Sequence, residues 1–443
     1  MSSLEEINKM MEYIGISSID EIFGNTIPSE FFLKQPLSIP RFQEREVVQY
    51  IKGELAKNLY FDPRNVYAGG GVWPIYVPSA VKSIICRSEF LTSYTPYQAE
   101  ISQGVLQALY EYQSLMAELL DMDVVNSSMY DWSSAAAEAL LMACRVTKRS
   151  SVLIPKGMYY NRKSVINTYM WGANVKVIEY PFDEHGNIDL TYLRSVLTYE
   201  KIAGIYIEYP NSYGYICENI EDVVSLVHAT GGLVVFGTDP LALPLLKPPG
   251  ELDADIVVGE GQPLGNPIFF GGPLLGIFAT KGDIKLIREM PGRIIGLTKT
   301  IDGETAYTMI LQTREQHIRR EKATSNICTN EALTAIASAV YISLLGKTGL
   351  INLSKRLLIN SHKLYDILTQ FGFQGAFNLP FFREFSLKIN SPYDNVKIRR
   401  SLIERGILFG IIVNPFHVIS VNEFHDENAF NYLLSQLKEV IQQ

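Results

Sequence analysis

Six short apolar runs recur through the middle of the chain, and stretches of helical character separate the first four of them. These stretches, Asn161–Met170, Asp189–Leu197 and Glu218–Ala229, are each long enough for a crossover helix. Apolar runs that alternate with helices about every 25–30 residues indicate βαβ units and a mainly parallel sheet. The sixth run follows the fifth too closely for an ordinary crossover helix, which favours an antiparallel strand there. The runs are Val152–Ile154, Val175–Ile178, Ile202–Ile207, Leu233–Phe236, Ile256–Val258 and Leu274–Phe278.

The N-terminal 65 residues have the spacing of amphipathic helices instead of strands. Apolar residues recur at intervals of three and four positions in two places, and prolines separate these places. This spacing places them on one face of a helix. The sequence therefore predicts a helical arm over residues 1–65. The spaced residues are Leu4, Ile7, Met11 and Ile14, and then Val47, Val48, Ile51 and Leu55.

The C-terminal part of the chain mixes strong helical periodicity with later strands. Residues 329–345 predict one helix, with Thr329 as its N-cap and Gly346 as its stop. A second helix is expected around 350–370, and strands near Phe385–Ile389 and Val418–Val421. We therefore expect a large α/β domain over residues 66–310 and a small α+β domain over residues 311–443.

Composition and charge narrow the classes of partner. The chain has 443 residues, 19% of them charged, and 39 basic against 47 acidic residues give a net charge of −8. This balance excludes a dominant nucleic-acid surface, which needs a basic face. No signal sequence opens the chain and no apolar run approaches the ~18–20 residues of a membrane helix, so we expect a cytoplasmic protein without membrane contact. Low charge and 25 tyrosines favour a large protein–protein interface.

The cysteines and histidines do not predict a metal site. Cys86, Cys144, Cys217 and Cys328 are widely scattered, and the six histidines show no paired spacing. Zinc sites and disulfide frameworks need close or patterned spacings. We expect reduced, individually buried thiols and no metal.

Asp239 is a candidate cofactor residue, because it follows the Leu233–Phe236 run at the carboxyl end of an expected parallel strand. A carboxylate there can pair with the pyridinium nitrogen of pyridoxal phosphate. The alternative is an ordinary turn aspartate before Pro240. A pyridoxal enzyme also needs a Schiff-base lysine, yet no lysine occurs between Lys247 and Lys281. The cofactor site is therefore incomplete on this chain.

Two blocks of the sequence are dense in functional residue types. The first, 87–100, contains Tyr94-Thr95-Pro96-Tyr97-Gln98-Ala99-Glu100, and the second is Gln312–Lys322. A tyrosine-rich loop on the core and a solvated helix face with paired charges are the structural alternatives. For Tyr94–Glu100 we favour a binding role, because a non-helical segment there offers stacking surface and hydrogen-bonding groups.

The two blocks, extended to Ser88–Gly104 and Leu311–Asn330, resemble subunit 1 of glycine dehydrogenase (decarboxylating), the P-protein of the glycine cleavage system. The resemblance extends from the Ile27–Pro28 region through Gly349. It implies the aspartate-aminotransferase fold (pyridoxal-phosphate fold type I) and a heterotetramer with two copies of each of two homologous subunits. Subunit 2 of such an enzyme holds the lysine-bound pyridoxal phosphate. Gln262-Pro263 stands where subunit 2 has its His-Lys pair.

The resemblance also implies a reaction and a set of site residues. The assembly decarboxylates glycine and passes the aminomethyl group to the lipoyl arm of the H-protein. We expect this chain to contribute Tyr94, Thr95, Tyr97, Gln98 and Glu100 to the active site of its partner. Asp239, Ser133, Ser134 and Gln262 would then line a vestigial cofactor pocket.

One residue departs from the family pattern. Trp132 follows Asp131 where the family has a glycine, in the loop that cradles the cofactor phosphate at a helix N-terminus. We interpret the tryptophan as further decay of the pocket, or as altered packing against the partner.

The leading hypothesis is a non-cofactor subunit of glycine decarboxylase that is inactive alone. A stand-alone pyridoxal enzyme that uses an atypical lysine, such as Lys247, is one alternative. A non-catalytic scaffold of the same fold is the other.

Overall fold

The chain forms two units, Met1–Leu59 and Tyr60–Gln443, in a computed structural model that describes residues 3–35, 37–269, 271–328, 330–389 and 394–442. The first unit contains helices α1 (Leu4–Ile14), α2 (Ile19–Thr26) and α3 (Glu44–Leu55). Ser3 and Glu6 form a capping box at the start of α1, which satisfies two backbone N–H groups of its first turn. None of the three helices has a buried residue, so their apolar side chains stay uncovered within this unit.

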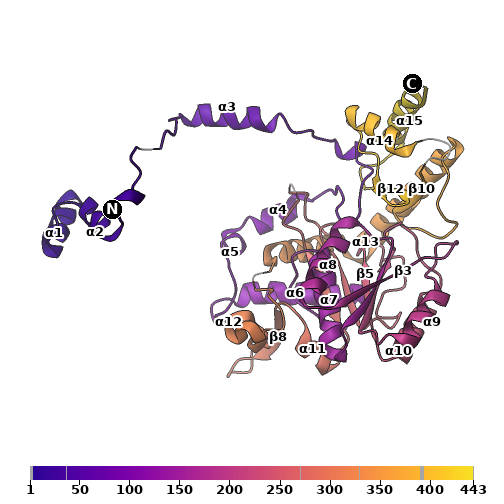
Figure 1. The fold of residues 1–443 in the computed structure, drawn as a ribbon, viewed down its shortest axis with the longest axis horizontal. Helices are drawn as coiled ribbons and strands as arrows, with labels where there is room; N and C mark the ends of the chain where they lie inside the picture. The colour runs from indigo at the N-terminus through magenta and orange to yellow at the C-terminus, as the bar shows by residue number, and fades with distance from the viewer. Residues whose placement is uncertain (1–2, 36, 270, 329, 390–393, 443) are drawn as a thin grey trace. The chain divides into compact units, whose positions relative to one another are not determined.

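A seven-stranded sheet forms the centre of the second unit (Figure 1). Its strand order is β1-β7-β6-β5-β4-β2-β3. Strands β2 to β6 run parallel, while β7 is antiparallel to both of its neighbours. Both the mainly parallel sheet and the antiparallel sixth run are therefore confirmed. The strands are β1 (Val124–Val125), β2 (Ser151–Pro155), β3 (Lys176–Tyr180), β4 (Gly204–Tyr209), β5 (Leu233–Thr238), β6 (Ile256–Glu260) and β7 (Gly276–Thr280).

Helices cover both faces of this sheet. In β2, Leu153 points to a core shared with α6, α9, α10 and the first half of α13, whereas Val152 and Ile154 point to α7 and α8. Burial on both faces explains why the parallel strands read as continuous apolar runs instead of alternating ones. The helices are α6 (Gln103–Leu120), α7 (Trp132–Thr147), α8 (Tyr160–Gly172), α9 (Leu190–Tyr199), α10 (Ile220–Ala229) and α13 (Ala332–Gln370).

Helix α13 bends at Gly346, which has a positive φ of 59° and separates two helical halves. The predicted pair of helices with a stop at Gly346 is confirmed. Its predicted N-cap Thr329 lies outside the described residues, and Glu331 precedes the first helical residue. The first half packs on the large sheet, and the second half brings Leu364 and Leu368 to a separate C-terminal core.

That C-terminal core lies on an antiparallel sheet of order β10-β12-β11, with α14 and α15 (Figure 1). The two strands predicted near 385–389 and 418–421 are the paired strands β10 and β12. The division at residue 310 stays a prediction, since Tyr60–Gln443 forms one unit. The elements are β10 (Glu384–Lys388), β11 (Ile411–Val413), β12 (Phe416–Ser420), α14 (Asn395–Glu404) and α15 (Glu427–Gln442).

Smaller elements surround the sheet edge near β1. A hairpin of β8 and β9 packs against α6. These elements are α4 (Ser79–Ile85), α5 (Ser88–Leu91), α11 (Ile284–Glu289), β8 (Ile294–Lys299), β9 (Thr305–Ile310) and α12 (Gln316–Arg319).

Helix α13 is long and apolar enough to cross a membrane by length and composition alone, which the sequence analysis did not expect. Half of its most apolar 18-residue stretch is buried inside the fold, as in the core helix of a folded domain. The four cysteines are free thiols, but Cys86 is exposed and only Cys217 is buried, so individual burial was wrong for Cys86. Within the described part of the chain, no group of three His, Cys, Asp or Glu side chains could hold a metal ion.

Candidate functional site

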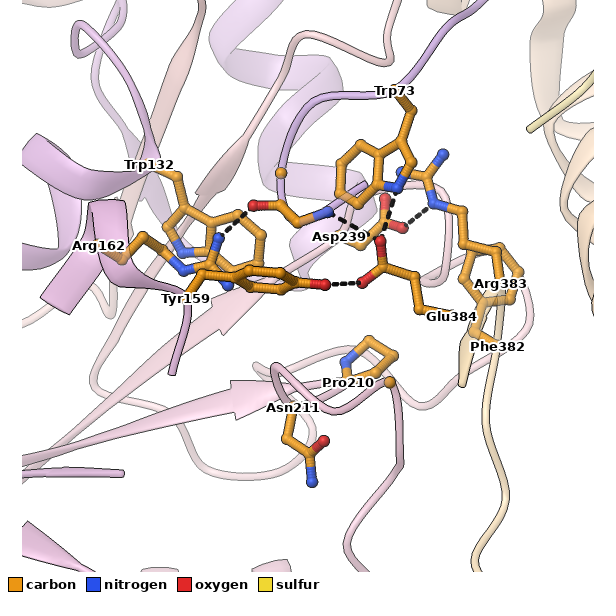
Figure 2. A pocket seen from close by; sticks show the side chains of 13 residues that line it. Trp73, Trp132, Tyr159, Arg162, Pro210, Asn211, Asp239, Phe382, Arg383 and Glu384 are labelled. Atoms are coloured by element: carbon orange, nitrogen blue, oxygen red, sulfur yellow. Dashed lines mark hydrogen bonds and ion pairs between the residues drawn. The ribbon is translucent and has the colours of Figure 1, made fainter. Parts of the chain in front are cut away.

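A small pocket lies at the carboxyl ends of the parallel strands β4 and β5, where open α/β sheets bind ligands (Figure 2). Pro210 follows β4, Asp239 follows β5, and Glu384 begins β10. The cavity measures about 20 Å³, which is room for about one water molecule. Its lining residues are Gly70, Gly71, Trp73, Trp132, Tyr159, Arg162, Pro210, Asn211, Gly214, Asp239, Phe382, Arg383 and Glu384.

Asp239 lines this pocket but is already paired. Its Oδ2 lies 2.5 Å from Nε of Arg383, and its Oδ1 accepts a hydrogen bond from the backbone N–H of Leu241 at 3.1 Å. Burial raises the pKa of Asp239, and the charge of Arg383 opposes that rise. The guanidinium of Arg383 also stacks 3.5 Å from the ring centroid of Trp73. The position that a pyridinium nitrogen would need is thus held by an internal cation, as Figure 2 shows.

Glu384 connects three other walls of the pocket. Its Oε1 accepts hydrogen bonds from the backbone N–H of Gly70 and from Nε1 of Trp73, both at 2.9 Å. Its Oε2 accepts one from the hydroxyl of Tyr159 at 3.2 Å (Figure 2). Gly70 and Tyr159, the residue directly before α8, are therefore both hydrogen-bonded to the first residue of β10.

Trp132 fills the side of the pocket at the start of α7. The guanidinium of Arg162 lies 4.0 Å above its ring, and this arginine pairs with Glu208 at 2.6 Å. The backbone N–H of Trp132 donates to Oε2 of Glu260, and that of Ser134 donates to the side chain of Asp131. The carboxyl groups of Glu260 and Asp131 therefore occupy the helix N-terminus where a phosphate would otherwise bind.

The other expected pocket residues do not line the cavity. Ser133 and Ser134 are buried in the first turn of α7, where the Ser134 hydroxyl belongs to the helix cap. Gln262 accepts from the backbone N–H of Trp73 and donates to the backbone oxygens of Trp73 and Asn266, so its amide is fully engaged. Of the four predicted residues, only Asp239 faces the cavity.

The residues present do not fit pyridoxal phosphate. The cavity holds about one water molecule, Asp239 is paired with Arg383, and the first backbone N–H groups of α7 donate to internal carboxyl groups. Among the described residues, no lysine lines the cavity. The side chain of Lys247, the alternative Schiff-base lysine, is 44% exposed and pairs with Glu221 at 3.0 Å.

The Tyr94–Glu100 loop lies apart from this pocket lining. Tyr94, Tyr97, Gln98 and Glu100 are exposed, and Thr95 is half-buried. Nη2 of Arg293 donates to the hydroxyl of Tyr97 at 3.1 Å. The ring of Tyr97 meets that of His317 edge-on, with centroids 5.6 Å apart. The structure therefore brings the two dense sequence blocks together at one surface.

The second block is only partly a solvated face. Arg314 is buried and donates to the backbone oxygens of Leu311, Met290 and Gly292, and burial lowers its pKa to about 10. Glu315 is buried as well, at the start of the short helix α12. For these two residues the alternative of a solvated helix face is wrong, because their side chains are buried.

Sequence reasoning missed the residues that do most to close the pocket and to hold the loop. Arg383 and Glu384 are charged positions inside an apolar stretch, and such an interruption of a buried strand is a signal for a buried pair. Arg293 had no such signal, since it precedes β8 in an ordinary turn context. Arg162 and Glu208 lie on different elements and meet only in the fold.

A family model described as the glycine cleavage system P-protein matches residues 2–437 of this chain. The chain belongs to the P-protein family. It is 48% identical, over 99% of its length and 97% of the relative's, to a probable glycine dehydrogenase (decarboxylating) subunit 1 from Staphylothermus marinus. A relative with the same description from Sulfurisphaera tokodaii is 45% identical over 99% of this chain and 98% of its own.

Solved structures agree with this family. A glycine decarboxylase (P-protein) of the glycine cleavage system, in inhibitor-bound form, superimposes with a TM-score of 0.88 at 36% identity over 99% of each chain. A glutamate decarboxylase from Lactobacillus brevis shares the fold alone, with a TM-score of 0.70 at 12% identity over 93% of this chain and 95% of its own. The expected α/β fold of the pyridoxal-phosphate fold type I class is therefore confirmed for this P-protein family member.

Proposed function

We propose that this chain is the non-cofactor subunit of a glycine decarboxylase whose pyridoxal phosphate is held by a homologous partner, glycine dehydrogenase subunit 2. The observation that carries the proposal is the small pocket, in which the Arg383 guanidinium pairs with the Asp239 carboxyl that a cofactor would need. The family relatives are described as subunit 1, which supports the existence of a second subunit. Alone, the chain is expected to be inactive.

The proposed contribution to catalysis comes from the exposed loop. Tyr94, Thr95, Tyr97, Gln98 and Glu100 offer two phenols, a hydroxyl, an amide and a carboxylate on one short segment. Exposed groups of these types can complete a neighbouring active site and orient a substrate there. We expect them to line the approach of the lipoyl arm of the H-protein in the assembled glycine decarboxylase, which transfers the aminomethyl group of glycine to that arm.

The surface available to a partner supports assembly. Within Met1–Leu59, helix α1 leaves Leu4, Tyr13 and Ile14 exposed, and α3 leaves Val48 and Ile51 exposed. On α3 the two side chains are three positions apart and share one face, and an exposed apolar face of this kind can mark an interaction site. We propose a heterotetramer with two copies of each subunit, located in the cytoplasm.

The test is reconstitution of glycine–CO2 exchange. This chain, subunit 2, lipoylated H-protein and glycine are mixed, and incorporation of labelled CO2 into the glycine carboxyl is followed. The proposal expects exchange with both subunits and little with either alone. Full exchange by subunit 2 without this chain would refute it.

The scaffold alternative makes a different prediction in the same assay. If the chain only supports its partner, Tyr97→Phe and Glu100→Gln leave the exchange rate unchanged while the assembled mass persists. If the loop contributes to the partner's active site, at least one of these variants lowers the rate without disrupting assembly.

A further inference from the structure

Arg293 is a buried cation that connects the two sequence blocks of the exposed surface. Its side chain is 4% exposed, although it lies in the turn that leads into β8. Its backbone oxygen accepts a 2.7 Å hydrogen bond from the N–H of Ser127. Because a buried charge is costly unless it is paired, the guanidinium needs fixed partners.

The guanidinium has a partner in each of three directions. Nη2 donates to the hydroxyl of Tyr97 and Nη1 to Oδ1 of Asn330, both at 3.1 Å. Nε lies 3.7 Å from Oε2 of Glu315, a distance that makes an ion pair but no hydrogen bond. Asn330 is itself anchored, since its Nδ2 donates to the hydroxyl of Ser127 at 2.8 Å. Because the guanidinium is planar and rigid, these three partners together fix its orientation.

Tyr97 stands at the outer end of this network. The residue is 43% exposed, its ring centroid lies 5.4 Å from the Arg293 guanidinium carbon, and its ring is nearly perpendicular to that of His317. The Nδ1 of His317 is 3.5 Å from the same Oε2 of Glu315. Because the Tyr97 oxygen accepts from Arg293, its own O–H can donate outward. An exposed phenol is thus fixed in direction by buried groups.

We infer that Arg293 is a positioning residue, which holds the Tyr97 hydroxyl as a hydrogen-bond donor toward an anionic group in the partner's active site. This inference rests on the proposed function of the Tyr94–Glu100 loop. A loop side chain alone samples many directions, and a catalytic contact requires placement within about half an ångström. The buried Arg293–Glu315 pair supplies the rigidity that the loop lacks.

A double-mutant cycle on the reconstituted complex tests this inference. The variants are Tyr97→Phe, which removes only the hydroxyl, Arg293→Lys, which keeps the charge but removes the fork, and both together. Since a hydrogen bond to a charged group is at stake, each single variant is expected to lower the exchange rate by about tenfold or more. The double variant is expected to be no slower than the slower single variant.

A structural role gives a different pattern. If Arg293 only stabilises the fold, Arg293→Lys lowers the rate by the same factor in the Tyr97→Phe background, and the inference is overturned while the proposed function stands. If Tyr97→Phe retains the full rate, the contribution of Tyr97 itself fails. The mass of the complex is measured for every variant, so that loss of assembly is recognised.

Two further variants keep the test decisive. Asn330→Ala removes one support of the guanidinium without touching the charge, and its loss of rate should also vanish in the Tyr97→Phe background. Arg145→Lys is the control, because Arg145 also pairs with a glutamate, Glu289 at 2.9 Å, but it donates to a backbone oxygen and makes no contact with Tyr97. It should leave the exchange rate unchanged, and its effect should be independent of Tyr97→Phe.

Discussion

Asp239 keeps the location of a cofactor carboxylate but has a protein cation as its partner. Its position after β5 follows from strand geometry, whereas Arg383 reaches it from 144 residues away. Removing one member of such a buried pair leaves an uncompensated charge, while removing both can be close to neutral. Loss of either partner alone is therefore expected to destabilise the contact between the sheet and the C-terminal residues.

Asp239→Asn is expected to lower the free energy of unfolding by about 3–5 kcal/mol, because it leaves Arg383 buried and unpaired. The double variant Asp239→Asn with Arg383→Met is expected to recover part of that loss. Denaturant unfolding measures both values. The control Asp62→Asn breaks an exposed pair with Arg64 and should cost less than about 1 kcal/mol. An Asp239→Asn cost as small as the control would contradict the role of the pair.

Glu260 is a buried carboxyl group beside the pocket whose contribution to stability depends on pH. It lies at the end of β6 and accepts backbone hydrogen bonds from Gln262 and Leu275 at 3.0 and 2.9 Å. Burial raises its pKa to about 8, although backbone donors oppose the rise. The folded chain therefore keeps a proton that the unfolded chain loses above its ordinary pKa of 4.5. The stability that this group contributes is fully present below that pH and is lost as pH rises toward 8.

Between about pH 5 and 8, the wild-type free energy of unfolding is expected to fall by up to about 1.4 kcal/mol per pH unit because of this group. Glu260→Gln removes the titration and should flatten that slope, even if the variant is less stable at every pH. Unfolding curves at several pH values give the slope. The exposed control Glu251→Gln should keep the wild-type slope, and equal slopes for wild type and Glu260→Gln would refute the assignment.

At the scale of elements, the local sequence pattern predicts where strands and helix breaks occur, whereas tertiary packing decides which polar side chains are buried. Strands β2 to β7 could be predicted from their apolar runs, which burial on both faces makes continuous in β4, β5 and β6, whereas the two-residue β1 was not predicted. The break in α13 was equally local, because Gly346 adopts a positive φ that other residues avoid. The second block could not be assigned, because whether Arg314 and Glu315 face water depends on what packs over them.

Helix α3 has an apolar face that no other described residue of its own unit buries. Val48→Glu with Ile51→Glu places charges on its apolar face. This double variant is expected to weaken association with subunit 2 by about tenfold or more, since it removes two apolar side chains that the proposed interface would bury. Analytical ultracentrifugation of the mixed subunits measures the effect. Gln49→Glu adds a charge on the same helix at a polar position and serves as control. Unchanged association of the double variant would place the interface elsewhere.

At the scale of the whole molecule, the chain has the fold of pyridoxal enzymes and a pocket that does not fit the cofactor. Pyridoxal phosphate added to the purified chain is expected to give no visible Schiff-base band that borohydride abolishes, because no described lysine lines the cavity. Subunit 2 in the same experiment is expected to give the band. A borohydride-sensitive band on this chain would favour the stand-alone enzyme with an atypical lysine.

The sequence by itself determined the class of fold, and it predicted an incomplete cofactor site and the candidate loop. Each of these rests on local information: runs of apolar residues, a stretch without lysine, and a short motif. Only the tertiary structure decided that Arg383 neutralises Asp239, and that Arg293 holds Tyr97 from 196 residues away. Contacts between distant residues depend on how the elements pack, and no local pattern encodes which buried charge meets which.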